Sequence, residues 1–106
     1  MQLPPFGLGH SLYRGNLHGH SNHSDGLLSA QAVIKTYADL GYDFTCLSDH
    51  LWIDDHYAAK SVYDGSALDR KDFITLPSAE LHCYGKKYDQ DGVWHLLANG
   101  LPTDFD

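Results

Sequence analysis

Histidine and carboxylate side chains at several places along the chain could together bind a divalent cation. His18 and His20 lie two residues apart at the end of a strand-like run, and this spacing places both imidazoles on one face of a strand. Two neutral ring nitrogens arranged in this way can bind one metal ion. Asp25 follows in a Ser-Asp-Gly sequence, which is also an ordinary turn. The pair therefore indicates a metal site only if further ligands reach it.

Three more candidate ligands belong to later runs of strand-like sequence. His50 comes just after the apolar run 44–47, Glu80 ends a third run, and His95 lies within a fourth run. In parallel α/β folds, ligand sites gather at the carboxyl edge of the sheet. The coincidence of four strands is far more specific than any single pair, and it predicts one shared site at that edge.

The elements that position these residues follow from periodicity and turn residues. A helical stripe is formed by Ala30, Val33, Ile34, Tyr37 and Ala38, with Ser29 as its N-cap and Gly41 at its end. The remaining predicted segments are a lead-in (1–11), strands (12–18, 44–47, 74–82 and 93–98), a second helix (54–63) and a charged hairpin loop (85–92). Pro77 suggests an edge or a bulge in the third strand. The order predicts an α/β fold that opens with a βαβ unit and a parallel strand pair.

Charge and composition exclude several classes of function. The chain has 106 residues and a formal net charge of −7, which argues against a general nucleic-acid surface. No basic stretch followed by an apolar run opens the sequence, and no apolar run is long enough to span a membrane. Cys46 and Cys83 resemble buried thiols of a reducing compartment. We therefore expect a cytoplasmic protein with a small-molecule substrate and no membrane partner.

Four segments resemble motifs of the PHP (polymerase and histidinol phosphatase) superfamily, in order and with ordinary spacing. NLHGHSNHSDG is similar to its first motif, FTCLSDH to its second, LPSAELH to its third, and VWHLLANGL to the following strand. The resemblance covers the chain from Tyr13 onward. The first two motifs are quite specific, and the last two gain value from their order. Three positions depart from the family pattern. Asn16 replaces an Asp, Ser21 replaces a Thr, and Leu51 follows His50 where the family usually has Asn or Asp. These departures concern the substrate class more than metal binding.

The resemblance implies a distorted (β/α)7 barrel, of which residues 12–106 would be the N-terminal half, with the C-terminal half absent. It implies two or three divalent ions (Zn, Mn or Fe). His18, His20 and Glu80 would hold one ion, Glu80 and His95 a second, and Asp25 and His50 a third. Each of these sets lacks a ligand that the family supplies from a later motif. Glu80 and His50 are the expected catalytic residues, and the expected supporting residues around the ligands are Asp49, Asn16 and His82.

The expected function is metal-dependent hydrolysis of a phosphoester by a metal-activated water. The Gly-Asn-Leu-His opening at residues 15–18 also resembles a branch that hydrolyses carbamates and carboxylic esters, which is the second interpretation. A third interpretation is a metal-binding module without turnover, because the implied ligand sets are incomplete. Self-association could complete a site from two chains.

Overall fold

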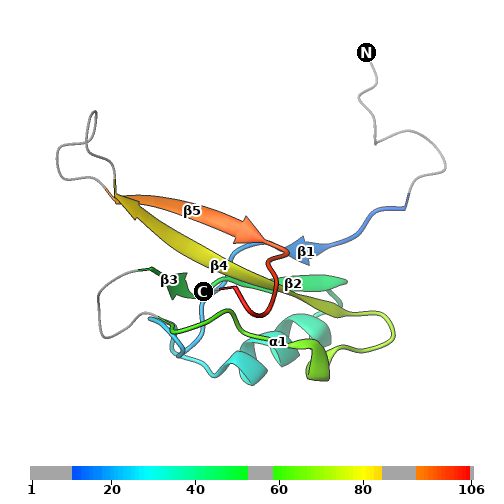
Figure 1. Cartoon of the computed structure of the whole chain (residues 1–106). Helices are drawn as coiled ribbons and strands as arrows, with labels where there is room; N and C mark the ends of the chain where they lie inside the picture. Colours follow the sequence, from blue (N-terminus) through cyan, green and yellow to red (C-terminus); the bar gives the residue numbers. More distant parts are fainter. Residues whose placement is uncertain (1–10, 53–58, 85–92, 106) are drawn as a thin grey trace, which may run out of the picture.

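The computed structural model describes residues 11–52, 59–84 and 93–105, and Figure 1 shows their arrangement. The helices and strands in these ranges are β1 (Gly15–Asn16), α1 (Ala30–Asp39), β2 (Phe44–Leu47), β3 (His50–Leu51), the 3-10 helix η1 (Ser66–Leu68), β4 (Ile74–Tyr84) and β5 (Val93–Asn99). The sheet is mostly parallel, and only β5 runs antiparallel to its neighbour β4. The α/β class and the parallel pair around the helix are confirmed; the (β/α)7 barrel stays a prediction.

Helix α1 begins and ends where the local sequence signals place it. Ser29 has an extended backbone, and its side chain accepts a hydrogen bond from the backbone nitrogen of Ala32, which caps the helix. Ala30 and Ile34 are buried, so the apolar stripe faces the sheet. Gly41 has a φ of 77°, a left-handed conformation that glycine adopts without strain and that ends helices.

Strands β2 and β3 lie along the same edge of β4 in one continuous register. Phe44 pairs with Ile74, and six residues later His50 pairs with Glu80 at the same offset. Residues 48–49 interrupt the strand between them, but the carbonyl of Asp49 still accepts a hydrogen bond from the backbone nitrogen of Glu80 at 3.2 Å. This register carries His50 to the side of Glu80.

Strand β5 covers the other edge of β4 and fixes a second register. His82 pairs directly with His95, and Ser78 pairs with Asn99 at the end of the ladder. Pro77, which has no N–H to donate, falls just beyond the last of these pairs, and its carbonyl accepts hydrogen bonds from the backbone nitrogens of residues 100 and 101 at 2.9 Å each. The antiparallel pairing extends β4 to Tyr84, so Glu80 lies inside this strand and not at the strand end that its sequence predicted.

Two predicted elements differ in the structure. The strand predicted over residues 12–18 is reduced to Gly15–Asn16, where the ring of Phe44 packs so closely that a Cβ on Gly15 would lie 1.9 Å from it. Of the helix predicted over 54–63, residues 54–58 lie outside the described ranges, and residues 59–63 are not helical. The segment instead buries Val62 in an apolar cluster. The hairpin loop predicted at 85–92 also lies outside the described residues.

The two faces of β4 differ in chemistry because successive strand residues point to opposite sides. Ala79 and Leu81 are buried on one face and pack with Leu51 and Val62. Ser78, Glu80 and His82 alternate with them and are also buried, so the other face is polar. This polar face is where the candidate site lies. Among the described residues, none of the helices has the length and apolar character needed to cross a membrane.

Candidate metal centre

Histidine and carboxylate side chains from four segments meet on the polar face of β4. The segments are the loop after β1, strand β3, strand β4 and strand β5, and the predicted ligands that they carry are His18, His20, Asp25, His50, Glu80 and His95. Glu80 lies at the centre: it is 6% exposed, and three histidine nitrogens lie 2.8 to 3.0 Å from its carboxylate. The structure thus brings together residues that are up to 77 positions apart, from His18 to His95.

The first group, which we call the loop group, consists of His18, His20 and Glu80. The Nε2 atoms of His18 and His20 lie 3.1 Å apart, and they lie 3.0 and 2.8 Å from Oε2 of Glu80. These are hydrogen-bonding distances, and they are also close to the spacing of about 3 Å between ligands at right angles around an ion with bonds of about 2.1 Å. The side chain of His18 is 51% exposed, which leaves this group open to solvent.

The loop that carries the first two histidines is fixed by hydrogen bonds from the end of β2. The carboxylate of Asp49 accepts hydrogen bonds from the backbone nitrogen and hydroxyl of Ser21, both at 2.7 Å, and from the hydroxyl of Ser24 at 2.5 Å. Ser48 donates its backbone N–H to the carbonyl of Gly19 at 2.7 Å. A Cβ on Gly26 would lie 2.7 Å from the backbone of this loop, so only glycine fits there.

Asp25 connects the loop to β3. Its Oδ1 lies 2.7 Å from Nδ1 of His20, and its Oδ2 lies 3.3 Å from Nε2 of His50. An ionised carboxylate only accepts hydrogen bonds, so both ring nitrogens can donate to it. Alternatively, one cation could lie among the three residues, since their ligand atoms are all within 4.8 Å of one another.

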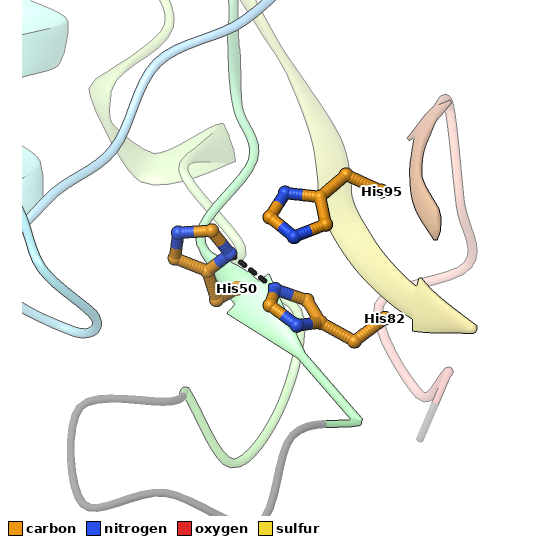
Figure 2. A group of neighbouring side chains, drawn as sticks. All are labelled: His50, His82 and His95. Atoms are coloured by element: carbon orange, nitrogen blue, oxygen red, sulfur yellow. Dashed lines mark hydrogen bonds between the residues drawn. The ribbon is translucent and has the colours of Figure 1, made fainter. Parts of the chain in front are cut away.

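The second group, which we call the strand group, consists of His50, His82 and His95. Nδ1 of His50 lies 2.6 Å from Nε2 of His82, and one nitrogen from each of the three rings lies within 4.8 Å of the others. Figure 2 shows the three rings turned towards a common space. His95 also contacts Glu80, with its Nδ1 2.8 Å from Oε1 of that carboxylate. Glu80 therefore adjoins both groups: its Oε2 contacts the loop histidines and lies 3.6 Å from Nδ1 of His50, and its Oε1 contacts His95.

When both rings are neutral, the hydrogen atoms available in the loop group are too few for its contacts. A neutral imidazole has one N–H and one lone pair. If Nδ1 of His20 donates to Asp25, its Nε2 keeps a lone pair, and this lone pair faces Oε2 of Glu80 and Nε2 of His18. The Nε2 of His18 can place only one proton among these atoms. A divalent cation between them would satisfy all three, so the donor set fits a metal ion, and Zn²⁺, Mn²⁺ and Fe²⁺ all accept such donors.

Both carboxylates of the centre are held in the ionised form. Partial burial raises the pKa of Glu80, but hydrogen bonds from His18 and His95 outweigh it, so the pKa lies below its ordinary value. Slight burial likewise raises the pKa of Asp25, and the hydrogen bond and charge of His20 bring it below the ordinary value. The ionised carboxylate is the form that binds a cation.

His82 is held in the neutral form. Burial lowers its pKa, and the neighbouring rings of His95 and His50 lower it further, against a weaker opposing effect of Glu80. Neutral imidazole is the form that coordinates a metal. A neutral, buried histidine in this position is therefore ready to act as a ligand without first losing a proton.

The three predicted supporting residues have different surroundings. Nδ2 of Asn16, the last residue of β1, donates a hydrogen bond to the hydroxyl of Thr45 on β2 at 3.4 Å. Asp49 orients the loop and not an individual imidazole ring. His82 belongs to the strand group itself, a position that its spacing of two residues from Glu80 on one strand face could have indicated.

Of the remaining histidines, only His23 lies among the residues that the structure describes, and it belongs to neither group. His23 is exposed, with its ring centroid 5.2 Å from that of Tyr63, and His10 and His56 lie outside the described residues. A separate cavity of about 510 Å³ lies at the N-terminal ends of β2 and β4 and is lined in part by Tyr13 and Phe73. Most of its exposed wall is apolar, and the charged residues Asp43, Lys71 and Asp72 also line it.

No family model, no curated protein and no solved structure matches the chain. What the centre does is therefore inferred from its own residues and their geometry. Those residues include three groups that could hold a metal ion, and this is the starting point for a function.

Proposed function

We propose that this protein is a metal-dependent hydrolase that cleaves phosphoesters of small molecules. The single observation that carries the proposal is the convergence of the Nε2 atoms of His18 and His20 on Oε2 of Glu80, at mutual distances of 2.8 to 3.1 Å. The resemblance of the surrounding segments to PHP motifs supports the same class of reaction. Metal identity is left open among Zn²⁺, Mn²⁺ and Fe²⁺.

The loop group would bind the cation and present it to substrate. A divalent cation bound there would polarise a phosphoryl oxygen and lower the pKa of a bound water towards about 7. His20 would be oriented for this by Asp25, which accepts the hydrogen on its other nitrogen. The 51% exposure of His18 and the 48% exposure of the Asp25 side chain leave room for a substrate to approach.

Glu80 would act as a ligand and not as a proton donor, because its lowered pKa keeps it ionised near neutral pH. Its two oxygens face different groups, Oε2 the loop histidines and Oε1 His95. A carboxylate in this position could hold a cation on either side. His50, the other expected catalytic residue, lies between Asp25 and His82, and its Nδ1 is 3.6 Å from Oε2 of Glu80.

The test compares hydrolysis by the 106-residue chain with that of a double variant, His18→Ala with His20→Ala. The chain is loaded separately with Zn²⁺, Mn²⁺ or Fe²⁺ and assayed with an aryl phosphate and, in parallel, an aryl carboxylic ester. We expect metal-dependent turnover of the phosphate that the double variant loses together with its bound metal. The matched control is His23→Ala, because His23 is exposed and lies outside both groups.

Three results would overturn parts of the proposal. Retention of stoichiometric metal by the double variant, measured by elemental analysis, would refute the ligand assignment. Faster turnover of the ester than of the phosphate would replace the phosphoesterase with an esterase, the interpretation suggested by the opening at residues 15–18. Metal binding without turnover of either substrate would favour a binding module.

A further inference from the structure

Two independent strand registers place His50, His82 and His95 together. His50 is paired with Glu80 on one edge of β4, and His95 is paired with His82 on the other edge. The ring centroids lie 4.7 Å apart for His50 and His82, 4.3 Å for His82 and His95, and 5.7 Å for His50 and His95. The two strand registers therefore determine that these three residues are neighbours.

The burial of His82 has no ordinary structural explanation. The residue is 5% exposed, and its Nδ1 has no hydrogen-bond partner among the residues that the structure describes. Its Nε2 faces Nδ1 of His50 at 2.6 Å. A structural histidine is usually buried to bond the backbone or an acidic group, whereas this one turns its partnered nitrogen towards another imidazole.

Carboxylates lie behind the two outer rings of the strand group. Oε1 of Glu80 lies 2.8 Å from Nδ1 of His95, and Oδ2 of Asp25 lies 3.3 Å from Nε2 of His50. Each carboxylate can accept the ring hydrogen, which leaves the opposite nitrogen of that ring with a lone pair. These opposite nitrogens, Nε2 of His95 and Nδ1 of His50, are on the side of His82 (Figure 2). Metal-binding histidines are typically oriented by such carboxylates.

We infer that His50, His82 and His95 form a second cation site, additional to the loop group, that binds a transition metal through three imidazole nitrogens. Imidazole donors suit Zn²⁺, Cu²⁺ and Ni²⁺, whereas Mn²⁺ prefers carboxylate and water oxygens. Zn²⁺ should therefore fill both groups and Mn²⁺ only the loop group, which contributes the carboxylate. This inference goes beyond the proposed hydrolase function and does not require turnover.

The experiment measures bound metal per chain. The 106-residue chain is equilibrated with Zn²⁺ or Mn²⁺, desalted and analysed for metal, with calorimetric titration for affinity. We expect two equivalents of Zn²⁺ and one of Mn²⁺ for the unaltered chain. His82→Gln should lose one equivalent of Zn²⁺ and keep its Mn²⁺, while His18→Ala should lose the other equivalent and its Mn²⁺.

His95→Gln provides a second test that does not disturb the buried part of the sheet, because the His95 side chain is 47% exposed. It should lose the same equivalent of Zn²⁺ as His82→Gln and decides the question if the latter does not fold. His23→Gln is the matched control and should keep both equivalents. Circular dichroism establishes that each variant is folded.

The possible outcomes separate this inference from the proposed function. Two equivalents of Zn²⁺ in folded His82→Gln and His95→Gln, at unchanged affinity, overturn the strand site. A single equivalent in the unaltered chain that only His18→Ala removes overturns the strand site and leaves the proposed centre intact. A single equivalent that only His82→Gln and His95→Gln remove supports the strand site and overturns the proposed centre. Absence of bound Zn²⁺ in the unaltered chain overturns both.

Discussion

The loop group and the strand group use similar side chains but depend on different parts of the fold. In the loop group, His18 is 51% exposed and is positioned by a loop that hydrogen bonds to Asp49 hold in place. In the strand group, His50 and His82 are buried and are positioned by the pairing of β3 with β4 and β4 with β5. A loop can open to a substrate, whereas a strand register is fixed when the sheet forms. The loop group is therefore the more accessible of the two, and the strand group is the more rigidly positioned.

Glu80 is the residue whose loss should affect the comparison most. Glu80→Gln removes the negative charge that lies between the two groups. This carboxylate contacts His18, His20 and His95, so its loss should affect the metal affinity of both groups. We expect the metal affinity of the loop group to fall by more than about 100-fold, and that of the strand group by about tenfold, the range for losing a supporting contact. Calorimetric titration with Zn²⁺ measures both.

The control for Glu80→Gln is Asp64→Asn, which removes an exposed carboxylate that accepts a hydrogen bond from the backbone nitrogen of Ser66 and belongs to neither group. Its metal affinities should equal those of the unaltered chain. Equal losses at the two groups in Glu80→Gln would contradict the assignment of Glu80 as a direct ligand of the loop group alone.

Asp25 should affect both groups alike, and to a smaller extent. Its two oxygens face Nδ1 of His20 and Nε2 of His50, one ring from each group. In Asp25→Asn we expect the Zn²⁺ affinity of each group to fall by about tenfold, with the number of bound ions unchanged. Loss of a whole equivalent in the same titration would instead show that Asp25 binds an ion directly, together with His20 and His50.

Asp49→Asn should affect the two groups differently, with the smallest change in metal affinity of the three substitutions. Asp49→Asn weakens the hydrogen bonds to Ser21 and Ser24 that hold the loop, and it leaves both strand registers in place. The loop group should lose less than about tenfold in affinity, below the effect of a residue that touches a ligand. The free energy of unfolding should fall by about 2 kcal/mol, since hydrogen bonds to a buried charge are lost.

Urea unfolding of the metal-free chain measures this loss of stability, and calorimetric titration measures the two affinities. The strand group serves as the internal control for Asp49→Asn. A fall in its affinity as large as that of the loop group would mean that the two groups are not positioned independently.

The sequence predicted those parts of the fold whose signals act within a few residues. Ser29 and Gly41 mark the ends of α1, and the apolar run 44–47 is strand β2. The sequence did not predict that residues 59–63 are non-helical. Val62 packs in a cluster with Leu51 and Leu81, which come from other segments of the chain. Long-range packing overrides local propensity in such segments.

The candidate site divides in the same way. The sequence by itself determined that His18 and His20 share a strand-like spacing, and that Glu80 and His82 alternate with apolar residues along one strand. Only the tertiary structure decided that His82 meets His50 and His95, because the pairing registers on the two edges of β4 fix which residues are neighbours. A shift of one residue in either register would turn the paired side chains to opposite faces. Registers between distant segments are selected by the packing of the whole sheet, and no local spacing encodes them.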